Sequence, residues 1–150
     1  MIAYPDTSFL CALYRAQVNS PRAAEHFRVM PEPVFVSSPL LFEFRQSLRW
    51  QAYLYSKDSA KGFLKQSAQL ALNQLNANIS TGAIILVSID WSDVVSIAER
   101  LSSQYTWTLG YRGFDLLHAA TALHLGVTEF LTFDVKQKQL AEAEGLIVPF

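Results

Sequence analysis

Short apolar runs alternate along the chain with longer segments in which apolar residues recur every three or four positions. The runs are typical of buried strands, and the longer segments are typical of amphipathic helices. Strands are predicted at Met1–Tyr4, Pro33–Ser37, Ala83–Ile89, Glu129–Phe133 and Leu146–Val148. Helices are predicted at Ser8–Ala16, from Ser20, from Ser38 to about Tyr55, and at Ser59–Asn78, Trp91–Tyr105, Asp115–Leu125 and Val135–Glu144.

Local signals mark where several of these elements begin and end. Serine followed by proline, at Ser20 and again at Ser38, is typical of a helix start because proline suits the first helical turn. Gly126 and Gly145 are well placed to end helices. The uninterrupted apolar run AIILVSI, which begins at Ala83, predicts a strand that is buried on both faces of a sheet.

The alternation of strands and helices predicts the fold class. Strands that are separated by helices pair in parallel, and the helices then cover both faces of the sheet. We therefore expect a three-layer α/β/α domain with a central parallel sheet. A chain of 150 residues suits one domain, residues 1–150, with a core of its own.

Four acidic residues are predicted to meet at one edge of this sheet. Asp6 and Asp134 directly follow strands, and Glu43 lies in the second turn of a helix entered from a strand. The helix after Asp115 covers about 18 Å, and the next strand returns by roughly 17 Å, so Asp115 and Asp134 end at the same edge. Sites in parallel sheets form at the carboxyl ends of the strands.

Four carboxylates in one hollow favour a bound cation. Two such charges about 4.5 Å apart repel by about 4 kcal/mol at an effective dielectric constant of about 20, so they take up protons or bind metal. Oxygen ligands alone favour Mg²⁺ or Mn²⁺, and no Cys/His spacing points to zinc. Thr7, Ser8 and Thr132 stand beside the acids as candidate supporting hydroxyls.

Each of these residues also has a simpler interpretation. Asp6, Asp115 and Asp134 stand where helix-capping residues stand, although capping does not exclude metal binding. Glu43 is flanked by apolar residues and would face solvent if the helix were rotated. His118 shares a helical face with Asp115, so it either contacts phosphate or serves as a hydrogen-bonded structural histidine.

The composition limits the environment of the protein. A single cysteine, Cys11, excludes an internal disulfide and fits a reducing compartment, so we expect a cytoplasmic protein. No apolar run approaches the ~20 residues that span a bilayer, and Asp6 interrupts any signal peptide. The mean hydropathy is positive, +0.16. Together with the aromatic residues of the segment 50–64, it favours a homodimer.

The charge distribution suits a polyanionic ligand held over a metal ion. The formal net charge is −1, which argues against indiscriminate binding to nucleic acid. Outside the four acids the chain is net positive. Basic residues cluster at Arg45, Arg49, Lys57, Lys61 and Lys65, and again at Arg112, Lys136 and Lys138. Of these, Arg112 stands nearest to Asp115 in sequence and is a candidate substrate contact.

Four segments together resemble a known family. They are YPDTS around Asp6, LLFEFRQSL around Glu43, FDLLHAATAL around Asp115 and LTFDVKQKQLAEAEGL around Asp134. They are similar to PIN domains, and most of all to VapC-type toxins of bacterial toxin–antitoxin pairs. The resemblance covers essentially the whole chain, and the last two segments carry most of its specificity.

The resemblance implies a Mg²⁺- or Mn²⁺-dependent endoribonuclease. Metal-activated water would attack an RNA phosphodiester in line and leave a 5′-phosphate. Asp6, Glu43, Asp115 and Asp134 match the acidic quartet, and Thr132 matches a frequent hydroxyl position. The resemblance also implies a homodimer that a cognate antitoxin holds inactive. The alternative function is a catalytically silent module that keeps the fold and regulates through a protein partner.

Overall fold

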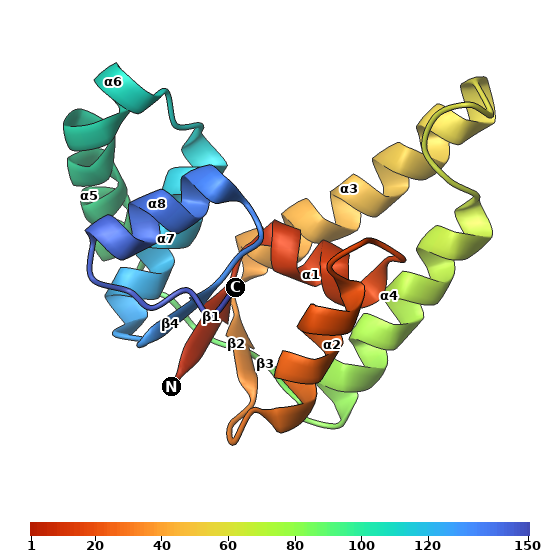
Figure 1. Ribbon diagram of the computed structural model, residues 1–150, viewed down its shortest axis with the longest axis horizontal. Coiled ribbons are helices and arrows are strands. Elements are labelled where there is room, and N and C mark those ends of the chain that lie inside the picture. The colour runs from red at the N-terminus through yellow and green to blue at the C-terminus, as the bar shows by residue number, and fades with distance from the viewer.

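Four parallel strands form the centre of the molecule in the computed structural model, which describes residues 1–150. They are β1 (Ala3–Pro5), β2 (Val34–Val36), β3 (Ile84–Leu86) and β4 (Glu129–Leu131). Backbone hydrogen bonds pair β1 with β4 and β2 with β3, both in parallel. Because β1 lies beside β2 (Figure 1), the strands follow the order β3–β2–β1–β4.

Helices cover both sides of these strands, which confirms the predicted α/β architecture. On one side lie α1 (Thr7–Tyr14), α2 (Ser20–Val29), α3 (Ser38–Lys57) and α4 (Lys65–Ser80). On the other lie α5 (Trp91–Leu101), a π-helical turn (Ser102–Thr106), α6 (Trp107–Leu109), α7 (Gly113–Leu125) and α8 (Val135–Ala143). None of these helices combines the length and the apolar character that crossing a membrane requires.

The expected helix signals act as predicted. Ser37 caps α3 by accepting a hydrogen bond from the Leu40 amide, and Pro39 occupies the first turn. The apolar face of α3, which includes Leu40 and Phe44, is buried in the core. Gly126 ends α7 in the left-handed conformation that glycine adopts at little cost.

The helix predicted from Ser59 begins only at Lys65, because the chain first makes a tight loop at the tip of α3. Gly62 has φ +63°, and a Cβ atom there would lie 2.0 Å from the carbonyl oxygen of Gln51. Because a right-handed helix requires a negative φ, the helix starts only after Gly62. Of the apolar residues of this helix, Leu75 is buried, whereas Leu70 is exposed.

The strand predicted to be buried on both faces was also wrong. Of the residues of β3 only Ile84 is buried, while Ile85 and Leu86 are 37% and 50% exposed. The reason is its position, since β3 lies at the edge of the sheet and has a neighbouring strand on one side only. The last predicted strand, Leu146–Val148, is reduced to one bridge between Ile147 and Glu129.

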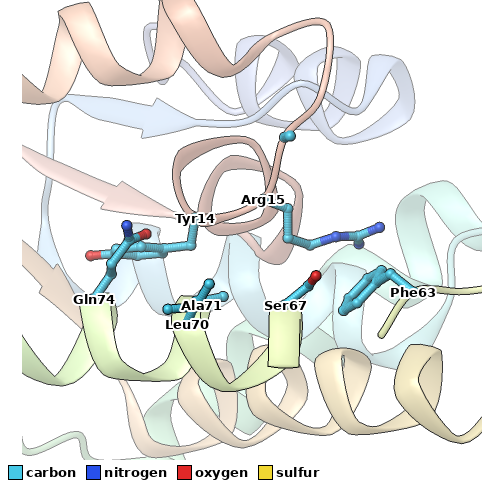
Figure 2. A pocket seen from close by; sticks show the side chains of 8 residues that line it. Tyr14, Arg15, Phe63, Ser67, Leu70, Ala71 and Gln74 are labelled. Carbon is cyan, nitrogen blue, oxygen red and sulfur yellow. The ribbon is translucent and has the colours of Figure 1, made fainter. Parts of the chain in front are cut away.

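The helices α3 and α4 form a hairpin that projects from the body of the molecule (Figure 1). We call residues 49–70 the α3–α4 arm. Trp50 and Tyr53 are exposed on it, and their rings stack with centroids 5.3 Å apart. At its base, a cavity of about 370 Å³ lies between the end of α1 and α4 (Figure 2), where Arg15 lies over the ring of Phe63.

Candidate active site

Asp6 directly follows β1 and is held on both carboxylate oxygens. Ser8 donates to Oδ1 at 2.6 Å, and Thr132, just after β4, donates to Oδ2 at 2.6 Å. The Phe9 amide also donates to Oδ1, so Asp6 is the N-cap of α1. The side chain is only 3% exposed. Burial raises the pKa of the Asp6 carboxyl, although these hydrogen bonds and the charge of His118 act in the opposite direction.

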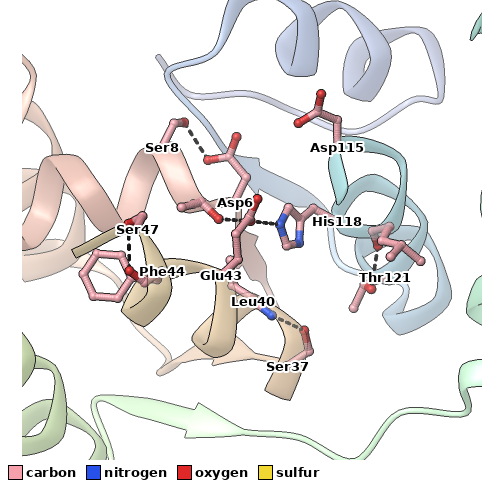
Figure 3. Close-up of polar contacts among 12 residues, drawn as sticks. Asp6, Ser8, Ser37, Leu40, Glu43, Phe44, Ser47, Asp115, His118 and Thr121 are labelled. Atoms are coloured by element: carbon pink, nitrogen blue, oxygen red, sulfur yellow. Dashed lines mark hydrogen bonds and ion pairs between the residues drawn. The ribbon is translucent and has the colours of Figure 1, made fainter. Parts of the chain in front are cut away.

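Glu43 faces the same edge from α3 and does not point to solvent. His118 Nε2 lies 2.5 Å from Glu43 Oε2, and the Thr7 hydroxyl donates to the same oxygen. Figure 3 shows Glu43 and His118 facing each other between α3 and α7, with Asp6 beside them. Burial alone would raise the pKa of Glu43, but the bonds from His118 and Thr7 lower it. His118 is thus hydrogen-bonded, as one of the two interpretations of its position in the sequence required.

Asp115 and Asp134 are joined by a residue that the sequence did not single out. The backbone N–H of Gln137 donates to Asp134 Oδ1 at 2.9 Å, so Asp134 is the N-cap of α8. The Gln137 side-chain nitrogen donates to the Asp115 carbonyl at 3.1 Å and lies 3.5 Å from its Oδ1. The Asp134-x-x-Gln137 spacing resembles a capping box, which predicts the cap but not the link to α7.

The remaining expected contact, Arg112, lies on the surface at the start of α7. Its backbone N–H lies 3.4 Å from Asp115 Oδ2, so the main chain rather than the guanidinium contacts the acid. Tyr111 beside it is buried, and its hydroxyl donates to the Lys136 carbonyl at 2.9 Å. Sequence patterns gave no signal for Tyr111.

Hydrogen bonds connect these acids in pairs: Gln137 contacts both Asp115 and Asp134, and Thr7, which follows Asp6, contacts Glu43. Burial raises the pKa of the Asp115 carboxyl, and the negative charges of Asp134 and Glu43 raise it further. Burial and the charges of Asp134 and Asp115 likewise raise the pKa of Tyr111. Figure 3 shows the Asp115 carboxylate on the side of α7 that faces Asp6. The edge is therefore acidic and has no cationic lysine or arginine bonded to its four carboxylates.

The donor set fits a hard divalent cation. All four acids offer oxygen, which Mg²⁺ and Mn²⁺ prefer, and the repulsion at Asp115 is the kind that a cation relieves. No three acidic, histidine or cysteine side chains converge here at the spacing that holds a metal ion. Asp6 and Glu43 instead each use their oxygens on neighbouring hydroxyl groups. The donor chemistry therefore fits the ion, whereas the spacing of these side chains in this structure does not form a complete metal site.

Asp115→Asn is expected to stabilise the metal-free protein at pH 7. Folding raises the pKa of the Asp115 carboxyl, so the protonated form favours the folded state. As pH rises through this raised pKa, the carboxyl ionises and that contribution to the free energy of unfolding is lost. Removing the charge should raise Tm by less than the about 2–4 °C that about 1 kcal/mol produces in a domain of this size, because solvent screens the repulsion at the half-exposed Asp115. The gain should shrink below about pH 4, where the wild-type carboxyl becomes protonated.

Thermal melts in EDTA between pH 3 and pH 8 test this expectation. Asp93→Asn is the matched control, since Asp93 is an exposed acid on α5. An equal gain in both variants, or a gain that does not depend on pH, would show that repulsion at the acidic edge is not the cause.

A family model described as PIN domain matches residues 3–143 of the chain. No curated protein sequence matches it. Among solved structures, it is similar to VapC20 of Mycobacterium tuberculosis, described as a sarcin-ricin loop cleaving toxin. The identity is 18% and the TM-score is 0.66, over 97% of this chain and 96% of that one.

Two further structures show the same fold. A toxin–antitoxin complex from Klebsiella pneumoniae is 20% identical, with a TM-score of 0.62 over 99% of this chain and 98% of that one. VapBC2 from Rickettsia felis, bound to a DNA fragment from its promoter, is 16% identical. Its TM-score is 0.64 over 99% of this chain and 97% of that one. At these identities the similarity establishes the fold, not the reaction.

Proposed function

The chain belongs to the PIN domain family, and on that premise we propose that it is a metal-dependent endoribonuclease of the VapC-like toxin type. One observation carries the proposal. Asp6, Glu43, Asp115 and Asp134 come from separate elements, and hydrogen bonds support their proposed grouping: Gln137 contacts Asp115 and Asp134, while Thr7 and His118 contact Glu43. Most folded proteins avoid the repulsion within such a group of carboxylates unless a cation compensates it.

The four carboxylates are proposed to hold Mg²⁺ or Mn²⁺, ions that nucleases of this family generally use. Such an ion, when bound, polarises a phosphodiester and lowers the pKa of a water that attacks in line. The chain orients the carboxylates: Ser8 and Thr132 hold Asp6, while Thr7 and His118 hold Glu43. The lowered pKa of Glu43 keeps it ionised at neutral pH and able to accept a hydrogen bond.

The direct test is incubation of the purified protein with structured RNAs in Mg²⁺ or Mn²⁺, with and without EDTA. We expect cleavage that EDTA abolishes, and products with a 5′-phosphate. RNA left intact by a folded protein at all metal concentrations would contradict the ribonuclease proposal. It would favour the catalytically silent module.

An antitoxin protein is the proposed inhibitor. The K. pneumoniae structure is a toxin–antitoxin complex of the same fold, and two features of this chain suit such a partner. The acidic edge can accept an arginine or lysine in place of the metal. The cavity between α1 and α4 (Figure 2), lined by Tyr14, Leu70 and Ala71 among others, can accept an apolar side chain of a partner helix that lies across it.

A homodimer is proposed because of the exposed α3–α4 arm. Trp50 and Tyr53 form a stacked aromatic patch there that the chain itself leaves uncovered. Light scattering at micromolar concentration should give twice the mass of one chain, 16.8 kDa. Co-expression with the protein encoded by an adjacent reading frame should give a larger complex. A monomer in light scattering would contradict the homodimer. The absence of a complex after co-expression would contradict the antitoxin proposal.

A further inference from the structure

A second cavity adjoins the acidic edge at Asp134. Its volume is about 260 Å³, and Thr132 and Asp134 form part of its wall. The other principal side chains are Arg22 from α2, Phe133 after β4, and Lys138 from α8. We call it the Arg22 pocket. Because it shares Asp134 with the acidic edge, a ligand that fills it lies directly beside the proposed metal ligands.

One wall of the Arg22 pocket is aromatic. The rings of Phe133 and Phe150 have centroids 4.3 Å apart, and both rest on the buried Phe9, at 6.2 Å and 5.7 Å. The stack fixes the position of the two outer rings, which are only partly buried. A planar group that enters the pocket therefore meets a rigid aromatic surface.

The pocket also carries positively charged side chains. The Arg22 guanidinium lies 5.7 Å from the centroids of both Phe133 and Phe150, and it takes part in none of the ion pairs of the chain. By contrast, Arg28 on the same helix is paired with Glu25 at 2.7 Å. Lys138 donates to the main-chain oxygen of Phe150 and lies 3.8 Å from Glu142, which places its charge at the pocket.

We propose that the Arg22 pocket binds one nucleotide of single-stranded RNA next to the bond that is cut. The nucleotide's phosphate contacts Arg22 and Lys138, and its base lies against Phe133 and Phe150. This inference rests on the proposed ribonuclease function and specifies how the substrate is held. A chain of phosphates that approaches four carboxylates needs cations nearby, and the unpaired Arg22 supplies one.

The dimensions and chemistry of the pocket favour this ligand. Its volume lies below the ~300–1,000 Å³ of pockets that enclose drug-sized molecules, so it encloses part of one nucleotide, such as its base, and excludes folded RNA. Proteins that hold single strands combine cations for the backbone with aromatic rings for the bases, and the pocket offers both. An acidic protein segment would use the cations but would not need the aromatic wall.

The test measures binding of a fluorescent ten-nucleotide RNA of mixed sequence by anisotropy, with Ca²⁺ in place of Mg²⁺. Arg22→Ala should weaken binding about 5-fold to 10-fold and reduce the magnitude of the salt slope by about 0.7, the value for one phosphate contact on a single strand. Arg28→Ala, the matched control from the same helix, should stay within about twofold of wild type, because Arg28 is paired and lies outside the pocket.

Phe133→Leu tests the aromatic wall separately. It should weaken binding about 5-fold or more with the salt slope unchanged, since stacking on aromatic rings does not involve counterions. An RNA of the same length without bases should lose this sensitivity to Phe133→Leu but keep the sensitivity to Arg22→Ala. Thermal melts of each variant confirm that it is folded, and Arg22 is exposed, so its replacement leaves the core intact.

The outcomes distinguish this inference from the proposed function. If Arg22→Ala and Arg28→Ala bind RNA equally, or if the wild type binds no RNA, the pocket assignment is wrong even when cleavage is observed. If binding depends on Arg22 but no RNA is cut in Mg²⁺ or Mn²⁺, the pocket remains an RNA-binding site, and the ribonuclease proposal fails. If Arg22→Ala binds RNA as the wild type does but loses affinity for a protein partner, the ligand of the Arg22 pocket is an acidic protein segment and not RNA.

Discussion

Replacing Asp6 by asparagine is expected to lower metal-dependent RNA cleavage by about 10²–10⁴-fold, the range that follows when several kcal/mol of transition-state stabilisation are lost. The fold should survive. Asparagine can keep the bonds from Ser8 and the Phe9 amide to Oδ1, and the Thr132 hydroxyl can turn to accept from the new NH₂ group. Removing a buried charge also favours the metal-free fold.

The control for this variant is Asp90→Asn. Asp90 caps α5 as Asp6 caps α1, and it accepts bonds from the Ser92 and Asp93 amides, but it lies outside the acidic edge. Asparagine caps a helix about as well as aspartate, so a residue that only caps should tolerate the change. Cleavage rates with varied Mn²⁺ and thermal melts are measured for both variants. Full activity of Asp6→Asn would exclude Asp6 from the mechanism.

Gln137→Leu is expected to weaken Mn²⁺ binding about 10-fold to 100-fold, the usual effect of removing a group that orients metal ligands. Gln137 connects α8 with α7 through its side-chain bonds to Asp115, while its backbone N–H donates to the carboxylate of Asp134. Without the side-chain bonds, Asp115 loses the contact that sets its position relative to Asp134. Stability should change little, because the Gln137 Oε1 atom is buried without a partner and its removal ends that cost.

Calorimetric titration with Mn²⁺ and a thermal melt in EDTA together test this role. Gln139→Leu is the matched control, since Gln139 is an exposed residue of the same helix. A positioning role requires reduced affinity for the ion with an unchanged melting temperature. If Gln137→Leu instead lowers the melting temperature and binds Mn²⁺ as the wild type does, the residue serves only the packing of α8 on α7.

The sequence by itself predicted the α/β fold, because the signals that define its elements are local. Ser38 and Pro39 begin α3, and Gly126 ends α7, through interactions within one helical turn. From the alternation of elements, the sequence also predicted that all four acids lie at the carboxyl ends of the strands. The same local rules gave wrong results where distant contacts decide. Gly62 must fit against Gln51, and β3 lies at the edge of the sheet.

Only the tertiary structure decided which side chains meet, because that depends on how the elements are rotated and spaced when they pack. The face of α3 that carries Glu43 was undecided until its packing brought the carboxylate to His118 on α7, 75 residues along the chain. No sequence pattern indicated the contact of Gln137 with Asp115 or that of Arg22 with the aromatic rings. Gln137 acquires its role because α8 crosses Asp115. Arg22 acquires its proposed role because its guanidinium lies over the rings of Phe133 and Phe150. Periodicity in the sequence predicts which face of an element is buried, but it does not predict which element packs against that face.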